Sequence, residues 1–328
     1  MKTHLEEIKD FMGFLRDILV SCVIVCGILG IIILTTADSD SYASSLAFKE
    51  TLLRDTPSPR MIIIGGSGAS SSIDSEKMLK ATGYNPVNMG LYAGLGMRFV
   101  FNQIRDEIRN GDIVLFAPEY ELLQQPSYGD GHLLLEMLHE NQTKLPEVIY
   151  PHSLVVIARA LPGWLQLQVR EIGLSIIKKF SPREKTFVEI LYGMENINMY
   201  GDLDTSIVSD VHLTPEDIMK DTYFVRPHID TTNLALLKDF AVNASAQGVK
   251  IFVVLPAVPR TLEKYNIDAV TSQYRELVDT MGTEYIIGTP GYFVFPDEQF
   301  LDSLGHLTAT GKAVRTDKIL KLLVPKLP

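Results

Sequence analysis

The chain has 328 residues, of which 46% are hydrophobic and 21% charged, and its formal net charge is −10. This acidic balance, without a basic stripe, argues against a nucleic-acid partner, because phosphate binding needs clustered Lys and Arg. Both cysteines, Cys22 and Cys26, fall inside one apolar segment. The rest of the chain therefore needs no disulfide and has no cysteine site for a metal.

That apolar segment covers residues 18–37 and carries no charged side chain. As a helix it would extend roughly 30 Å, which is the thickness of the hydrocarbon core of a bilayer. We expect a single-pass anchor in the cytoplasmic (inner) membrane after a short N-terminal segment, 1–17. The N-terminus would be cytoplasmic and the remainder extracytoplasmic, in the periplasm or outside the cell. A cleaved signal peptide is the alternative, although its apolar core is usually only about 7 to 15 residues long.

Residues 38–60 are polar, with Ser and Pro near the ends, and predict a stalk that contains a short helix at 46–54. The remaining residues, 61–328, are enough for one large domain. Short apolar runs that predict strands alternate there with longer amphipathic segments that predict helices. This order predicts an α/β domain with three layers, in which helices cover both faces of a flavodoxin-like parallel sheet. The expected strands are 61–64, 87–91, 112–117, 250–255 and 285–287, and the expected helices are 74–82, 97–109, 231–247, 266–281 and 307–323.

Between about residues 124 and 230 the alternation is lost, and we expect a helical insertion or lid. Its predicted helices are 153–161, 164–180 and 184–192. Its histidines show no tight metal-ligand spacing, so we interpret them as structural or exposed residues and expect neither a metal nor a cofactor.

Two remote segments carry the residue types of a serine hydrolase. The first predicted strand runs directly into Gly65-Gly66-Ser67, where glycines allow a sharp turn that can lift a hydroxyl into a crevice. Asp302 and His306 stand near the other end, before the last helix. An imidazole can take the proton of a serine, and a carboxylate can hold that imidazole in one tautomer. Because loops after parallel strands gather at one edge of a sheet, we expect the three side chains to meet there.

The chain resembles the SGNH, or GDSL-like, hydrolase superfamily, and more closely its membrane-anchored cell-envelope branch. That branch includes proteins related to polysaccharide O-acetylation factors and to the D-alanyl transfer protein of teichoic acids. Four blocks carry the resemblance, at both ends of the predicted domain but not in its middle. They are Gly65-Gly66-Ser67, Asn88-Met89-Gly90-Leu91, Ile113 to Tyr120, and Asp302 to Gly311.

The resemblance implies a role for each matching residue. Ser67 would be the nucleophile, His306 the general base and Asp302 the carboxylate that orients it. The N–H groups of Ser67 and of Ala93 or Gly94 would stabilise the oxyanion. The superfamily usually supplies an asparagine after the third strand, where this chain has Pro118-Glu119-Tyr120. Tyr120 would then donate in its place, or the third donor would be absent, a loss that commonly costs ~10²–10³ in rate.

Competing interpretations of the same residues remain open. Ser67 has three rivals in its own loop, Ser70, Ser71 and Ser72, and a Gly/Ser-rich turn often only begins a helix. Residues 65–72 would also suit a phosphate cradle at a helix N-terminus, although the lysine of a P-loop is absent and the Asp302/His306 pair is left without a role.

The sequence as a whole predicts an extracytoplasmic, membrane-tethered serine esterase or acyltransferase. Its substrate would be a cell-envelope glycan or lipid-linked saccharide together with an acyl donor. The alternative is a non-catalytic envelope-assembly subunit of the same fold. Such a subunit would bind a glycan or acyl carrier and dock onto a multi-pass membrane acyltransferase.

Overall fold

The computed structural model describes residues 9, 11–21, 23–25, 27, 40–141, 151–180, 186–208, 211–220 and 225–327. The chain divides into two compact units. One contains residues 162–183 together with the N-terminal residues up to 38, and the other contains residues 39–161 and 184–328. All residues of the candidate site lie in the second unit.

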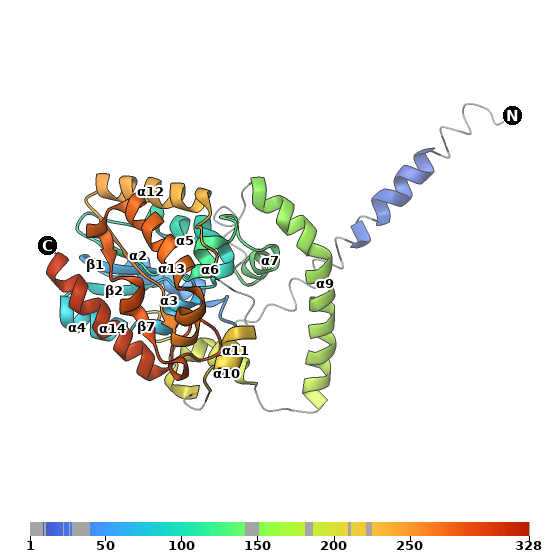
Figure 1. Cartoon of the computed structure of the whole chain (residues 1–328). Coiled ribbons are helices and arrows are strands. Elements are labelled where there is room, and N and C mark those ends of the chain that lie inside the picture. Colours follow the sequence, from blue (N-terminus) through green and yellow to red (C-terminus); the bar gives the residue numbers. More distant parts are fainter. Residues whose placement is uncertain are drawn as a thin grey trace. The chain divides into compact units, whose positions relative to one another are not determined.

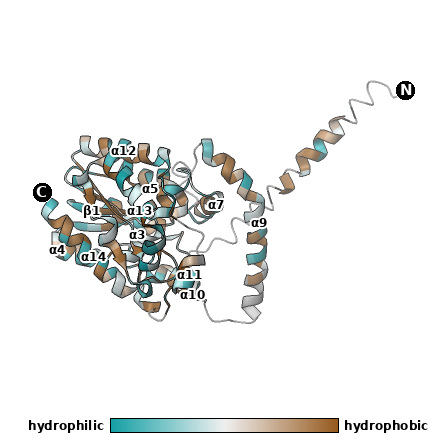
Figure 2. Cartoon of the chain, viewed as in Figure 1, coloured by the Kyte–Doolittle hydropathy of each residue, from teal (hydrophilic) through white to brown (hydrophobic). Residues whose placement is uncertain are grey.

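The described residues between 9 and 27 are helical, and several of them are hydrophobic (Figures 1 and 2). Their large apolar side chains are exposed. Much of the predicted anchor, including residues 28–37, lies outside the described residues. Within the described part of the chain, no helix combines the length and the apolar character needed to cross a bilayer. The anchor at 18–37 therefore stays a prediction.

The second unit is an α/β domain built on a five-stranded sheet in which every neighbouring pair is parallel. The strand order is β2-β1-β3-β4-β6, which is the 2-1-3-4-5 order of doubly wound sheets. All five strands lie where the apolar runs predicted them, within a few residues at each end. Their bounds are β1 Arg60–Ile64, β2 Asn85–Asn88, β3 Ile113–Phe116, β4 Lys250–Val254 and β6 Ile286–Ile287.

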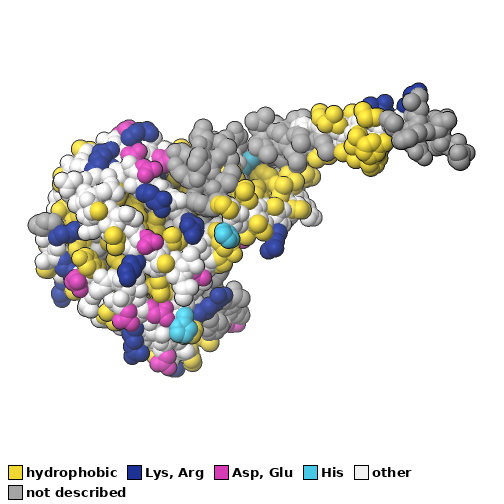
Figure 3. All heavy atoms as spheres, turned by 90° about the horizontal axis from the view of Figure 1, so that it is seen from above, with side chains coloured by type: hydrophobic (Ala, Val, Ile, Leu, Met, Phe, Trp, Pro, Cys, Tyr) yellow, Lys and Arg dark blue, Asp and Glu magenta, His cyan; other side chains and the backbone are white. Residues whose placement is uncertain are grey.

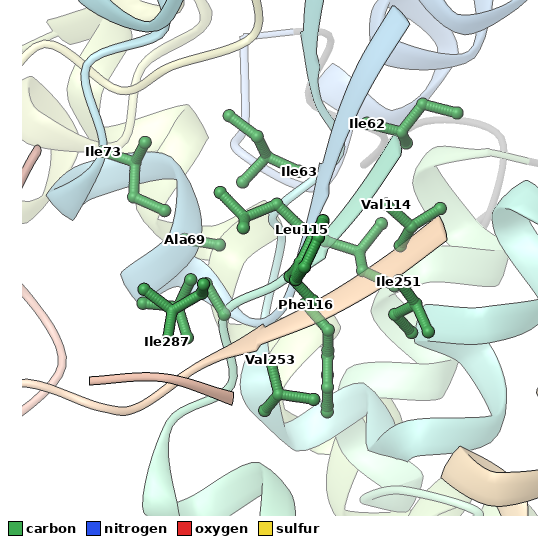
Figure 4. Packing of buried hydrophobic residues seen from close by; sticks show 14 of the residues in the cluster. Ile62, Ile63, Ala69, Ile73, Val114, Leu115, Phe116, Ile251, Val253 and Ile287 are labelled. Atoms are coloured by element: carbon green, nitrogen blue, oxygen red, sulfur yellow. The ribbon is translucent and has the colours of Figure 1, made fainter. Parts of the chain in front are cut away.

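Helices cover both faces of this sheet. On one face α5 (Gly96–Arg105) contacts α12 (Thr231–Ala246), and on the other α14 (Ala309–Leu323) contacts α3 (Ser67–Ser72) and α4 (Ser75–Thr82) (Figure 1). The central strands are buried on both sides, which explains why they read as unbroken Ile, Val, Leu and Phe. Figure 4 shows buried side chains of β1, β3 and β4 together with Ala69 and Ile73, which belong to the same core cluster.

The prediction of a polar stalk is wrong for residues 42–53. The helix α2 (Ser45–Asp55) forms where a short helix was expected, but it belongs to the domain. Tyr42, Leu46 and Leu53 are almost completely buried, and the Lys49 ammonium donates to the carbonyls of Asn88 and Gly201. The polar composition of this segment obscured the apolar face of the helix. The lysine on the same helix can be buried because its ammonium finds carbonyl acceptors inside the fold.

The insertion is helical in its described parts, as predicted. It contains α7 (Gly131–Glu140), α9 (Pro151–Phe180), α10 (Phe187–Leu191) and α11 (Pro215–Lys220), while α6 (Tyr120–Gln124) directly precedes it. The two helices expected at 153–161 and 164–180 form one continuous helix, because Pro162 is accommodated inside α9. A proline removes one main-chain hydrogen bond and normally ends or kinks a helix, and the boundary between the two units falls at this residue.

The helix expected at 266–281 forms the second part of α13 (Arg260–Met281). Asn266, whose φ of −139° is not helical, marks a kink there, and the helical residues before it were not predicted. A second, two-stranded sheet pairs β5 (Val258–Pro259) with β7 (Val294–Phe295), and it was not predicted. Two-residue strands are too short to produce an alternating pattern in the sequence.

Candidate active site

Ser67 stands at the switch point of the sheet, where chain connections from β1 and β3 leave in opposite directions. It is the first residue of α3, directly after the turn that follows β1. Gly66 allows this turn to close against its neighbours. A Cβ atom there would lie 2.6 Å from the Cβ of Ala93 and 2.5 Å from a carboxyl oxygen of Glu119. No larger residue fits between the serine loop and these neighbours.

The structure brings the three predicted catalytic side chains together. The Ser67 hydroxyl lies 2.6 Å from Nε2 of His306, although 239 positions separate these two residues in the chain. On the other side of the ring, Nδ1 lies 2.7 Å from Oδ1 of Asp302. A carboxylate can only accept, so the imidazole proton sits on Nδ1 and Nε2 is free to accept from the serine. This is the geometry in which an imidazole can serve as general base.

The environment of Asp302 keeps it ionised. Burial by itself raises the pKa of this carboxyl, but the hydrogen bond and the positive charge of His306 and the hydrogen bond from Tyr192 outweigh burial. The net effect is a pKa below the usual value. An ionised Asp302 both fixes the tautomer of His306 and stabilises the imidazolium that forms when Ser67 gives up its proton.

Tyr192 is a member of this cluster that the sequence did not reveal. Its hydroxyl donates to Oδ2 of Asp302 at 2.8 Å and lies 2.8 Å from Nδ1 of His306. Its ring packs edge-on against Tyr42, which in turn packs edge-on against Tyr92. Burial, together with the charge of Asp302, raises the pKa of Tyr192, so it stays a neutral donor. No motif marks a lone tyrosine in an insertion, so the sequence held no signal for it.

The three rival serines are engaged elsewhere. All are fully buried, whereas Ser67 is half-buried. The hydroxyls of Ser70 and Ser71 donate to the carbonyl of Ser67. The hydroxyl of Ser72 donates to the carbonyl of Gly305 at 2.8 Å and accepts from the N–H of Leu307. Ser72 thus ties α3 to the loop that carries His306.

Glu119 occupies the position after β3 where the resembling superfamily has an asparagine. Its two carboxyl oxygens accept from the N–H groups of Gly66, at 2.9 Å, and Gly68. Burial raises the pKa of this carboxyl, although the two N–H groups and the charge of His306 partly offset the effect. Glu119 was visible in the sequence only as a departure from the pattern. In the structure it holds the serine loop in place by accepting from the residues immediately before and after Ser67.

The predicted oxyanion donors are brought to the site in part. The N–H of Ser67 begins a helix and therefore has no partner within it. Ala93 begins a 3₁₀ turn (Ala93–Leu95) and lines the same cavity as Ser67, as does Tyr120. Gly94 does not line that cavity, and a Cβ atom on it would meet Leu133 instead. Asn88 holds the turn after β2, since its side chain bonds the Ala69 carbonyl and the N–H of Gly90.

A cavity of about 160 Å³ opens beside the Ser67 hydroxyl. Its walls combine the catalytic loops with apolar side chains and one buried cation. The lining includes Ser67, His306, Val225, Ala257, Leu304 and Arg315. A cavity of this size has room for a small acyl group beside the serine.

Within the described residues, no cluster of three or more His, Cys, Asp or Glu side chains could hold a metal ion. The histidines of the insertion contact ordinary neighbours. His139 lies against Glu140, His152 stacks on Tyr128, and His228 lies 2.7 Å from Glu276. On the face drawn in Figure 3, the visible Lys and Arg side chains of the domain are interspersed with Asp and Glu and form no basic stripe.

A scan against protein-family models found no match to this chain, and a search of curated proteins found none either.

Proposed function

We propose that this protein is an SGNH-like serine esterase or O-acyltransferase that works through an acyl-enzyme. One observation carries the proposal: Ser67, His306 and Asp302 form a continuous hydrogen-bonded chain with distances of 2.6 and 2.7 Å. Such a chain converts a weak hydroxyl nucleophile into an effective one. The cavity beside Ser67 supplies room for the acyl group.

The reaction follows from this geometry. His306 takes the proton of Ser67 while Oγ forms a bond to the ester carbonyl carbon, and the carbonyl oxygen becomes the oxyanion. The N–H groups of Ser67 and Ala93 are the donors we assign to it. The bond to the leaving alcohol then breaks, and His306 returns the proton to that alcohol. Water or a sugar hydroxyl next gives a proton to His306 and attacks the carbonyl carbon of the acyl-enzyme. The bond from that carbon to Ser67 Oγ then breaks, and His306 returns the proton to Oγ.

The proposed setting is the outer side of a cytoplasmic membrane, with residues 18–37 as the tether and a cell-envelope glycan or lipid-linked saccharide as the acyl acceptor. The uncharged apolar segment supports the tether. The resemblance of the four sequence blocks supports the substrate class. Carbonate extraction of membranes, followed by protease treatment of intact spheroplasts, tests the topology. A protein released by carbonate would contradict the tether.

A fluorophosphonate probe tests the chemistry directly, because it reacts only with an activated serine. We expect labelling of the intact chain on Ser67, and no labelling of the Ser67→Ala or His306→Ala variants. Ser71→Ala is the matched control, since Ser71 lies in the same helix but bonds only nearby atoms of that helix. Labelling that persists in Ser67→Ala would refute the assignment of the nucleophile.

A second candidate is favoured by Glu119. A carboxylate bound to the N–H groups of Gly66 and Gly68 places negative charge beside Ser67, where an oxyanion would have to form. This arrangement suits a non-catalytic subunit that keeps the fold and docks onto a multi-pass membrane acyltransferase. Inertness of the folded protein to the probe, together with its co-purification with such an acyltransferase, would select this candidate.

A further inference from the structure

Arg315 is a buried cation that the mechanism above does not use. It lies on α14 with 2% of its surface exposed, and it lines the same cavity as Ser67 and His306. Its Nη2 donates to the carbonyl of Leu255 at 3.3 Å. Its Nε is buried without any hydrogen-bond partner. In the described part of the chain, no carboxylate forms an ion pair with it.

A second buried arginine shows what a structural role looks like in this same domain. Arg60 is fully buried and pairs with the fully buried carboxylate of Asp112. Its remaining N–H groups donate to the carbonyls of Leu53 and Glu107. Every side-chain nitrogen of Arg60 thus has a partner inside the fold, whereas Nε of Arg315 has none.

An unpaired buried charge is costly, because it loses its hydration without gaining a counter-ion. Burial lowers the pKa of Arg315 to about 10, with the charge of Glu119 opposing that effect, so the guanidinium is still charged at neutral pH. Glu119 shares the cavity, but its two oxygens already accept from Gly66 and Gly68. Glu119 thus acts on Arg315 through its charge and forms no direct ion pair with it, so a hydrogen-bonded counter-ion can come from a ligand.

We propose that Arg315 binds a carboxylate on the acyl group of the substrate, so that the enzyme prefers esters of dicarboxylic acids such as succinate. The proposal rests on the function proposed above and specifies its substrate class. The planar guanidinium suits a carboxylate, which it can bind with two parallel hydrogen bonds. Val225, Ala257 and Leu304 would contact the methylene groups between the ester and the carboxylate. The cavity, at about 160 Å³, matches a short acyl chain.

The kinetic test compares two esters of similar length, p-nitrophenyl hemisuccinate and p-nitrophenyl butyrate. We expect a higher kcat/KM for the hemisuccinate with the unchanged protein, and a fall of about tenfold or more in the hemisuccinate-to-butyrate ratio in Arg315→Gln. Arg315→Lys should give an intermediate ratio because it keeps the charge but not the fork. Lys312→Gln is the matched control, since Lys312 is on the same helix and donates to the Leu203 carbonyl. An unchanged ratio in Arg315→Gln would overturn the proposal.

A binding test separates this inference from the proposed chemistry. Monomethyl succinate and methyl butyrate are titrated calorimetrically into Ser67→Ala and into Ser67→Ala/Arg315→Gln. Binding of the succinate ester to the first protein only, together with no fluorophosphonate labelling of the unchanged protein, would support the anion site and refute the esterase. Labelling of Ser67 without any Arg315-dependent preference would leave the esterase standing and refute the anion site.

A stability measurement distinguishes ligand binding by Arg315 from a purely structural role of this residue. Arg315→Met removes an unpaired buried charge, so its melting temperature should equal or exceed that of the unchanged protein. A clear fall in melting temperature, accompanied by equal losses for both esters, would show that Arg315 supports the fold and not the ligand.

Discussion

Tyr192 and Asp302 lie 110 positions apart in the chain, and the hydroxyl of the first donates to the carboxylate of the second at 2.8 Å. The same hydroxyl lies 2.8 Å from His306 Nδ1. The helical insertion therefore contributes directly to the site. Tyr192 donates to Oδ2 of Asp302, and Oδ1 of the same carboxylate lies against Nδ1 of the imidazole. The acid of this triad is positioned by a residue outside the four sequence blocks.

Replacing Tyr192 with Phe tests this positioning role. The ring and its packing on Tyr42 remain, but Asp302 loses a donor, and its pKa should rise toward the usual value. We expect kcat/KM to fall by about 3- to 30-fold, because Asp302 is held less firmly against the imidazole. Tyr92→Phe is the control, because Tyr92 bonds Glu136 within the same aromatic cluster but does not contact the triad. Equal effects of the two variants would contradict a specific role for Tyr192.

Ser72 offers a second, indirect route to His306. Its buried hydroxyl joins α3 to the carbonyl of Gly305 and the N–H of Leu307, on either side of the imidazole. Ser72→Ala leaves these two groups unsatisfied, so we expect a loss of about 1–3 kcal/mol in the free energy of unfolding and a several-fold fall in kcat. Urea denaturation and the rate of fluorophosphonate labelling measure the two effects.

Ser71→Ala is the matched control for that variant. Ser71 is equally buried and lies one position earlier, but its hydroxyl donates to the Ser67 carbonyl within its own helix. We expect a labelling rate close to that of the unchanged protein. A labelling rate that falls as far in Ser71→Ala as in Ser72→Ala would show that the helix, not the tie to the His306 loop, determines reactivity.

The sequence predicted the parts of this site that local chemistry marks. Ser67 follows a buried apolar strand and two glycines, and Asp302 and His306 precede the last helix, so each had a recognisable context. The sheet was predictable for the same reason, because strands buried on both faces are almost purely apolar. Tyr192 and Arg315 were not predictable. Each lies in a helical or turn segment whose pattern reflects packing, and only the fold brings them to the cavity.

Glu119 gives rise to a pH-dependent stability with a definite sign. Burial raises the pKa of its carboxyl in the folded protein, so the folded state holds this proton more tightly than the unfolded state does. Tighter proton binding by Glu119 adds to the free energy of unfolding. This added stability is fully present below the ordinary carboxyl pKa and is lost as the pH rises through the raised pKa of the folded protein. Glu119→Gln removes this titration. The difference in unfolding free energy between the two proteins should therefore change across that interval and be flat above it.

Urea unfolding at a series of pH values checks this expectation. At neutral pH, Glu119→Gln should also lose about 1–3 kcal/mol, because an amide has only one acceptor oxygen for the N–H groups of Gly66 and Gly68. Glu298→Gln is the control, since Glu298 is exposed. A difference curve for Glu119→Gln that does not vary with pH would contradict the raised pKa.

The buried pair of Arg60 and Asp112 fixes the edge of the sheet where β1 and β3 begin. Asp112 accepts from the Arg60 side chain, from the main-chain N–H of Arg60 and Arg109, and from the hydroxyl of Ser58. Asp112→Ala leaves a buried guanidinium without a counter-ion, and we expect a loss of about 3–5 kcal/mol in the free energy of unfolding. Arg60→Met/Asp112→Leu removes both charges, so it should cost less than either single replacement. Because this pair lies at the opposite end of the strands from Ser67, any double variant that folds should keep its labelling rate; a double variant less stable than both singles would contradict this account.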